Sequence, residues 1–91
     1  MGPLSLGRVL ATPGALRVLS EAGEDPLRLL ARHASGDWGE LDGHDRRENR
    51  RSLKNGWRVL SSYPVGEGGQ KVWVITEADR SVTTILLPEE Y

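Results

Sequence analysis

The second half of this chain contains three consecutive segments that are rich in β-branched and aromatic residues, and these segments largely decide its fold class. The segments are Trp57–Tyr63, Gln70–Thr76 and Ser81–Leu87. The stretches Pro64–Gly69 and Glu77–Arg80, which separate them, have the glycine and polar residues of tight turns. Strands joined by short turns pair antiparallel. The sequence therefore predicts a three-stranded antiparallel meander.

The first half of the chain carries helix signals instead. Thr12 and Asp25 each precede a proline, and a capping side chain followed by proline is favoured at helix starts. Apolar residues at helical spacing follow both prolines, so we expect helices over roughly 13–22 and 26–34. The run Leu6–Ala11 is short and apolar, and we interpret it as a possible fourth strand at the sheet edge.

A third helix is expected from Asp42 or Asp45 to Asn55, with Gly56 ending it. Leu53 is its only large aliphatic residue, so this helix should lie on the surface. Together these elements predict a single α+β domain over residues 1–91. Its two to three short helices would pack on a three- to four-stranded antiparallel meander.

The expected strand Gln70–Thr76 is apolar on both faces, because Val72 and Val74 alternate with Trp73 and Ile75. An antiparallel sheet with one solvated face alternates more clearly between apolar and polar residues. The second face therefore needs a cover, which a helix, the N-terminal segment or another copy of the chain would supply. The last possibility predicts a homodimer through the sheet.

Composition excludes several functional classes. The chain has no cysteine, which rules out disulfides, thiolate zinc sites and a cysteine nucleophile. We expect a cytoplasmic protein without a signal peptide, a membrane span or a cofactor. The formal net charge is −1, so nucleic-acid binding would need a local basic patch. Arginine greatly outnumbers lysine, which suits phosphate or carboxylate contacts but also fits a GC-rich genome.

The segment from His33 to His44 contains the densest group of chemically active side chains. Between its two imidazoles lie a tryptophan, three acids and several glycines. Imidazoles near carboxylates can transfer protons or bind a divalent metal, although the spacing matches no established metal motif. Helix capping alone would also explain some of these residues, and all three interpretations stay open. The candidate binding residues here are Ser35, Asp37, Trp38, Glu40 and Asp42.

The third expected helix carries a second candidate site. Arg46, Arg50 and Lys54 are four residues apart and therefore share one face of the helix. Such a cationic ridge can hold phosphates. The alternative is an ordinary solvated surface helix whose charges pair locally.

Several strings of this sequence resemble a family of small bacterial proteins from plasmids, phages and integrated elements. They are residues 32–42 (RHASGDWGELD), 73–81 (WVITEADRS) and 83–91 (TTILLPEEY), and the resemblance covers nearly the whole chain. Members often carry the label of a type I restriction enzyme modification subunit. A methyltransferase needs a doubly wound sheet for its cofactor, which three or four strands cannot supply. The resemblance implies a mobile-element setting without a mechanism.

The expected architecture is also similar to that of small metal-independent ribonucleases of the barnase and RelE type. Such an enzyme needs a base, an acid and cations for the phosphate. His33 would be the base, and Arg58 or Arg80 would hold the phosphate. The auxiliary donors would be Thr83, Thr84 or Tyr91.

Two functional hypotheses follow from the sequence. The first is a non-enzymatic accessory protein of a mobile genetic element, which binds a protein or nucleic-acid partner in defence or counter-defence. Its contacts would be the 35–42 bend and the arginine-rich helix. The alternative is a small ribonuclease of toxin type. In both hypotheses the bend brings His33 and the guanidinium groups to one place.

Overall fold

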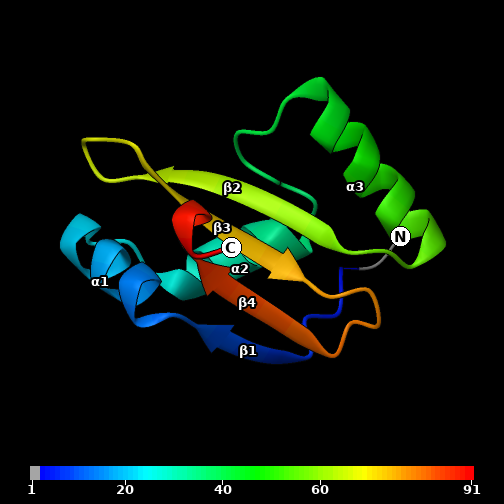
Figure 1. Ribbon diagram of the computed structural model, residues 1–91, viewed down its shortest axis with the longest axis horizontal. Helices are drawn as coiled ribbons and strands as arrows, with labels where there is room; N and C mark the ends of the chain where they lie inside the picture. The colour runs from blue at the N-terminus through cyan, green and yellow to red at the C-terminus, as the bar shows by residue number, and fades with distance from the viewer. Residues whose placement is uncertain (1–2) are drawn as a thin grey trace.

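The computed structural model describes residues 3–91, and it confirms an α+β fold. One strand is followed by three consecutive helices, and the last three strands then follow one another directly (Figure 1). The elements are β1 (Arg8–Ala11), α1 (Pro13–Ala22), α2 (Pro26–Ala34), α3 (Gly43–Asn55), β2 (Val59–Val65), β3 (Gln70–Thr76), β4 (Val82–Leu86) and the short 3-10 turn η1 (Pro88–Glu90).

The four strands form one sheet in the order β1-β4-β3-β2. The meander β2-β3-β4 is antiparallel, as predicted. β1 instead runs parallel to β4, with Arg8 opposite Val82 and Ala11 opposite Ile85, so the sheet is mixed and the expectation of a purely antiparallel sheet was wrong. A tight turn forces antiparallel pairing, but β1 and β4 are joined through all the other elements, and such a long connection also permits parallel pairing.

The second strand extends further than the sequence indicated, because it includes Pro64, which we had placed in a turn. β2 is an edge strand, and the backbone groups of Leu60 and Ser62 face away from β3 toward other partners. Pro64 follows on the same outward side. A proline there loses no sheet hydrogen bond, which is why edge strands tolerate it.

All three helices begin at the capping residues that the sequence indicated. The backbone N–H of Ala15 donates to Thr12 Oγ1 over 3.1 Å, and the side chain of Asp25 caps α2 in the same way. Asp42 is the cap of α3, so the earlier of the two predicted starts is the correct one. Gly56 ends α3 in the left-handed conformation, as expected from its position.

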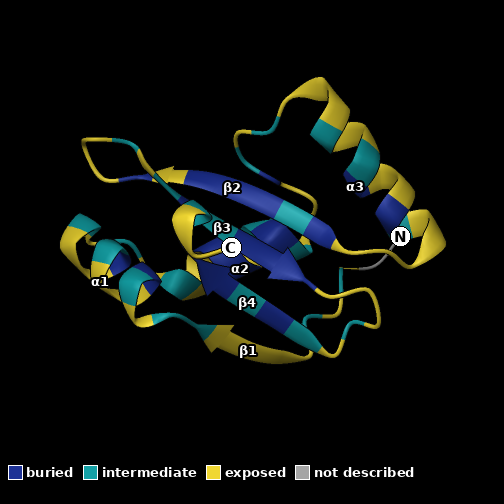
Figure 2. Cartoon of the chain, viewed as in Figure 1, coloured by how far each residue is buried: buried dark blue, intermediate teal, exposed yellow. Residues whose placement is uncertain are grey.

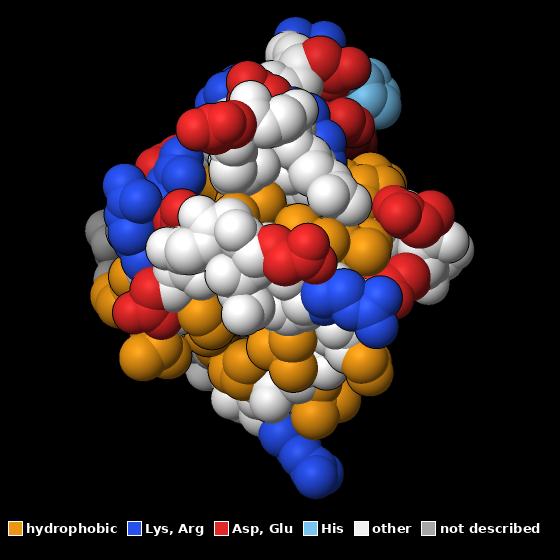
Figure 3. Space-filling view, turned by 90° about the vertical axis from the view of Figure 1, so that its left-hand side faces the viewer, with side chains coloured by type: hydrophobic (Ala, Val, Ile, Leu, Met, Phe, Trp, Pro, Cys, Tyr) orange, Lys and Arg blue, Asp and Glu red, His pale blue; other side chains and the backbone are white. Residues whose placement is uncertain are grey.

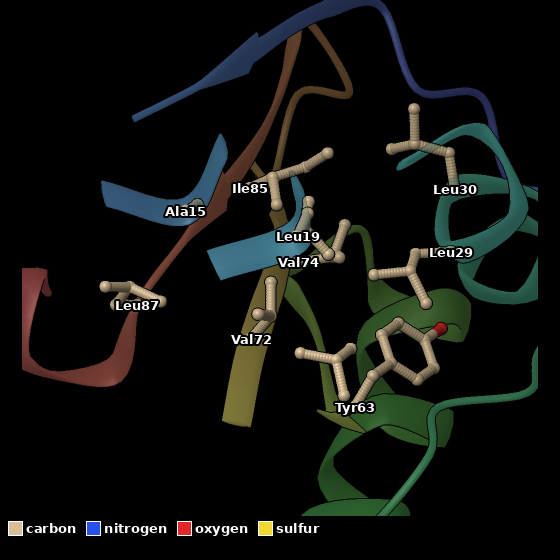
Figure 4. Close-up of a cluster of buried hydrophobic side chains, with 10 residues drawn as sticks. Ala15, Leu19, Leu29, Leu30, Tyr63, Val72, Val74, Ile85 and Leu87 are labelled. Atoms are coloured by element: carbon tan, nitrogen blue, oxygen red, sulfur yellow. The ribbon is translucent and has the colours of Figure 1, made fainter. Parts of the chain in front are cut away.

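The hydrophobic core lies on one face of the sheet, where α1 and α2 pack (Figure 4). Val72 and Val74 of β3 point into it, as the alternation predicted. Leu19 of α1 and Leu29 of α2 meet them from the helical layer, and Tyr63 closes the core on the β2 side. Among the described residues, none of the helices is both long and apolar enough to span a membrane.

The C-terminal segment lies on the opposite face of the sheet, in front of β3 in Figure 1. The Tyr91 ring meets the Trp73 ring edge to face, with 5.8 Å between their centroids. The Arg58 guanidinium lies over Tyr91 at 5.2 Å from the ring centroid. The chain therefore covers part of this face itself. A homodimer through the sheet stays a prediction.

Candidate functional site

His33 lies in the interior, in a chain of polar side chains beneath the sheet. The side chain is 0% exposed, which contradicts the expectation that it lines an accessible site. Its Nδ1 lies 2.6 Å from Ser61 Oγ, and its Nε2 lies 2.9 Å from Thr76 Oγ1. Thr76 Oγ1 in turn lies 2.7 Å from Thr83 Oγ1, which donates to the carbonyl of Leu6.

The carbonyl at the end of this chain fixes the direction of every hydrogen bond in it. The Leu6 carbonyl oxygen can only accept, so the Thr83 hydroxyl donates its single proton to it. The Thr83 oxygen must then accept from the Thr76 hydroxyl. Thr76 must then accept from His33, which places the imidazole proton on Nε2. Nδ1 is left as an acceptor for the Ser61 hydroxyl. The arrangement therefore satisfies a neutral ring at both nitrogens.

Burial also disfavours the charged form of this imidazole, and it lowers the pKa of His33 to about 4. A catalytic base needs an accessible nitrogen and a pKa near the working pH. His33 has neither. Thr83, predicted as an auxiliary donor, is also fully buried, and its hydroxyl already donates to the Leu6 carbonyl.

The remaining residues of the expected ribonuclease site lie in separate places. Arg80 donates to the backbone carbonyls of Ser52, Trp57 and Glu77, so it holds the end of α3 against the β3–β4 turn. Arg58 is on the opposite face of the sheet from the core, against Tyr91. Thr84 points to that same face, since it alternates with Thr83. The structure does not bring these groups together around His33.

The bend formed by residues 35–42 packs along the outer edge of β2. The backbone N–H of Ser62 donates to the Trp38 carbonyl over 3.0 Å, and Glu40 N–H donates to the Ser62 carbonyl over 2.7 Å. Gly39, between them, has φ +72°, and a Cβ at this position would lie 2.2 Å from the Ser62 oxygen. Only glycine fits there. The bend therefore acts as a short extra strand that covers this edge.

The polar side chains of the bend are engaged within the molecule. Asp37 accepts from Arg32 Nε over 2.6 Å, and this hydrogen bond holds the pKa of its carboxyl below the usual value. Glu40 pairs with Lys71, and the Ser35 hydroxyl donates to the Arg32 carbonyl. Most of these side chains serve to fix the bend.

The bend and α3 also enclose a small pocket of about 130 Å³. Its accessible lining includes Leu4, Ser35, Trp38 and Leu53, and His33 borders it from behind. Trp38 is 7% exposed, so its indole contributes to the wall of this pocket and very little to the outer surface of the protein. The pocket is a depression of mixed polar and apolar lining next to the arginine-rich helix.

Besides the contact of Arg80 with its last turn, two side chains of α3 itself attach this helix to the rest of the molecule. The Asn49 amide donates to the Leu60 carbonyl over 2.6 Å and accepts from the Leu60 N–H over 3.0 Å. Arg46 donates to the carbonyls of Gly39 and Leu41 in the bend. Arg46 therefore joins the bend to the arginine-rich helix, but His33, which was predicted to meet the guanidinium groups there, is buried. Asn49, which holds the middle of α3 to β2, was not identified from the sequence.

The outward face of α3 carries a row of cations. At about 100° per residue, an arc of about 100° around the helix contains Arg46, Arg50, Lys54 and Arg47, which we call the cationic stripe. All of its side chains are exposed, and no carboxylate falls within this arc. Within residues 3–91, no salt bridge involves any of them. Asp45 and Glu48 of the same helix face a different direction, toward Trp57 and Leu60.

The two imidazoles of the dense segment are separated by the fold. His44 is exposed at the start of α3, where its ring nitrogens lie near Asp45 and Glu48. Asp42, His44 and Asp45 each have one possible ligand atom within 4.8 Å of the others. Asp42 already caps the helix. His33 cannot join this group, because it is sealed beneath the sheet.

Comparison with known proteins finds no family model, no curated protein and no solved structure that matches this chain.

Proposed function

We propose that this chain is a non-enzymatic accessory protein that binds nucleic acid through the phosphate backbone, with the cationic stripe as its contact surface. The observation that carries the proposal is the exposed row of Arg46, Arg47, Arg50 and Lys54, in which no acid intervenes. A row of unpaired cations releases counterions from a phosphate backbone when it binds, and this supplies the free energy of association.

The composition of the stripe indicates what is recognised. Besides the cations, Gly43 is the only residue of α3 within this arc, so the stripe has no amide, hydroxyl or carboxylate to read adenine or cytosine, and its cations are expected to contact mainly phosphates. Contacts that go only to phosphates carry no sequence information. We therefore expect binding that is largely independent of sequence and strongly dependent on salt.

The resemblance to mobile-element proteins supports the setting of this proposal. A small nucleic-acid-binding protein of a plasmid or phage would act in defence or counter-defence, as an accessory to larger enzymes. The arrangement around His33 argues against the ribonuclease alternative, since the expected base is buried and both ring nitrogens are occupied.

Salt dependence of binding tests the proposal. The affinity for a short labelled DNA duplex is measured by fluorescence anisotropy between about 20 and 200 mM salt, and three to four phosphate contacts predict a log–log slope of about −3. The double variant Arg47→Glu/Arg50→Glu should weaken binding more than about tenfold and flatten the slope. Arg46 is left intact because it anchors the bend.

The matched control is Arg17→Glu/Arg28→Glu, which makes the same change in net charge on exposed positions of α1 and α2. It should bind nearly as the unmodified protein does. Equal losses in both variants, or no binding at low salt, would refute the stripe as the contact. Cleavage of RNA in the presence of chelator that disappears in His33→Ala would overturn the non-enzymatic assignment instead.

A further inference from the structure

The two edges of the sheet differ in how far other segments cover them. The β2 edge is covered by the bend, by Asn49 and by a proline at the outward position 64. No segment of residues 3–91 covers the β1 edge in this way, and Figure 1 shows β1 as the outermost element of its side of the molecule. Figure 2 shows the strand as exposed along nearly its whole length.

The backbone of β1 leaves one set of hydrogen-bonding groups free. Arg8 N–H donates to the Ser81 carbonyl over 2.9 Å, and Thr12 N–H donates to the Ile85 carbonyl over 3.0 Å. Even-numbered residues therefore face β4, and the N–H and C=O groups of Val9 and Ala11 point away from the sheet. Such a row of unpaired groups is a template for another strand.

The side chains at this edge are apolar and exposed. Val9 is 42% exposed and Leu10 is 45% exposed, and Leu16 of α1 lies close by along the chain at 47%. In Figure 3 hydrophobic side chains gather at the lower end of the molecule, the end at which β1 and α1 lie in Figure 1. Soluble proteins protect edge strands by shortness, charged side chains, proline or a bulge; β1 is short and begins with Arg8, but it contains no proline and no bulge.

We propose that β1 pairs antiparallel with β1 of a second copy of this chain, which joins the two sheets into one. The outward residues Val9 and Ala11 are two positions apart, so a two-fold axis through Leu10 places Val9 of each copy opposite Ala11 of the other. Each of these pairs exchanges both of its N–H···O bonds. The Leu10 side chains then meet across the axis, where a non-hydrogen-bonded pair lies closest.

Charge complementarity at the two ends of the pairing favours a second copy over an unrelated strand. The same register places Arg8 opposite Thr12 of the other copy. The Thr12 hydroxyl donates to Glu90 Oε1 over 2.7 Å, so the Glu90 carboxylate stands beside the position that Arg8 reaches. Both ends of the two-fold pair therefore match a guanidinium with a carboxylate, which a self-complementary interface requires.

The pairing is tested by measuring the molar mass of the protein as a function of its concentration, without nucleic acid. β1 is short, so the interface belongs to the weak class, and sedimentation equilibrium should span about 10 µM to 1 mM. The mass of the unmodified protein should rise from one chain toward two. Leu10→Lys should keep the mass at one chain, because two ammonium groups would then meet across the axis.

Leu27→Lys is the matched control, since Leu27 is 70% exposed at the start of α2 and lies outside the pairing. This variant should dimerise like the unmodified protein. Val9→Pro, which removes an outward N–H and no bond to β4, is the second test if circular dichroism shows that Leu10→Lys does not fold. A mass of one chain at every concentration would overturn the proposal. A dimer that survives Leu10→Lys and Val9→Pro but is lost in Arg58→Glu would overturn it as well. That result places the contact on the sheet face opposite the core, where Arg58 lies against Tyr91.

Discussion

Asn49 shows how much one side chain contributes to this fold. It is 3% exposed, and its amide group satisfies both outward backbone groups of Leu60. A neighbouring strand would normally do this. The side chain therefore substitutes for a strand at the point where the bend of residues 35–42 no longer covers β2.

Replacing Asn49 by alanine should lower the free energy of unfolding by about 2 kcal/mol, because the N–H and C=O of Leu60 lose their partners in a partly buried place. Urea unfolding followed by circular dichroism measures this change. Asn55→Ala, at the exposed end of the same helix, should change the free energy by less than about 0.5 kcal/mol. Equal effects of the two substitutions would contradict the role of Asn49.

The buried polar chain illustrates what the sequence can show about single residues. Ser61, Thr76 and Thr83 fall at inward positions on strands that otherwise point valines and isoleucine into the core. That alternation is readable and indicates buried hydrogen bonds. Their partner His33 comes from a helix far away in the sequence, and no local sequence pattern predicts a contact over such a separation. The sequence therefore predicts His33 as the base of an accessible site, and the burial of its ring contradicts this.

At the scale of elements, α3 differs from the other helices in how it is held. Its buried residues are Asn49 and Ser52, and both are polar. Hydrogen bonds from Arg46, Asn49 and Arg80 fix it to the body in place of an apolar stripe. The scarcity of large aliphatic residues correctly predicted a surface helix, because exposure is a local property of the pattern.

Arg80→Ala should loosen the last turn of α3, since it removes the guanidinium that bonds the carbonyls of Ser52 and Trp57. Amide hydrogen exchange should become about tenfold faster there, in line with a loss of about 1.4 kcal/mol of local stability. Exchange in β3 should stay unchanged. Arg51→Ala, which removes only an exposed pair with Glu48, is the control and should leave both regions as they are. Unchanged exchange at the end of α3 in Arg80→Ala would contradict the anchoring role.

The helices and the meander were predictable because caps and turns are local signals. Thr12, Asp25 and Asp42 each determine a helix start within a few residues. The direction of β1 depends on its pairing with β4 at the other end of the chain. The cationic stripe followed from helical spacing, but its closeness to the bend rests on contacts such as that of Arg46 with Gly39.

At the scale of the whole molecule, the polar chain through His33 connects α2, the three antiparallel strands and the N-terminal segment. Protonation of His33 therefore disturbs hydrogen bonds that join all of these elements. Burial lowers the pKa of His33 to about 4, below the value of about 6.5 expected in the unfolded chain. Above pH 6.5 the ring is neutral in both states, and below it the unfolded state binds the proton first.

Stability should therefore fall as the pH drops from about 6.5 toward 4, and the loss should reach about 2 kcal/mol between pH 7.5 and 5. Urea unfolding at the two pH values measures it. His33→Gln should be less stable at pH 7.5 but should lack most of this slope. His44→Gln, which alters the exposed imidazole, should keep it. A slope that persists in His33→Gln would assign the pH dependence to other groups.

The parallel pairing of β1 with β4 has a consequence for how this protein is made. β1 leaves the ribosome well before its partner β4, because three helices and two strands lie between them in the chain. The meander and the helices can assemble as they emerge. β1 stays unpaired until β4 has been synthesised through Leu86 and has left the ribosome. During that interval Val9 and Leu10 lack their sheet partner, and exposed apolar segments of this kind make a folding chain prone to aggregation.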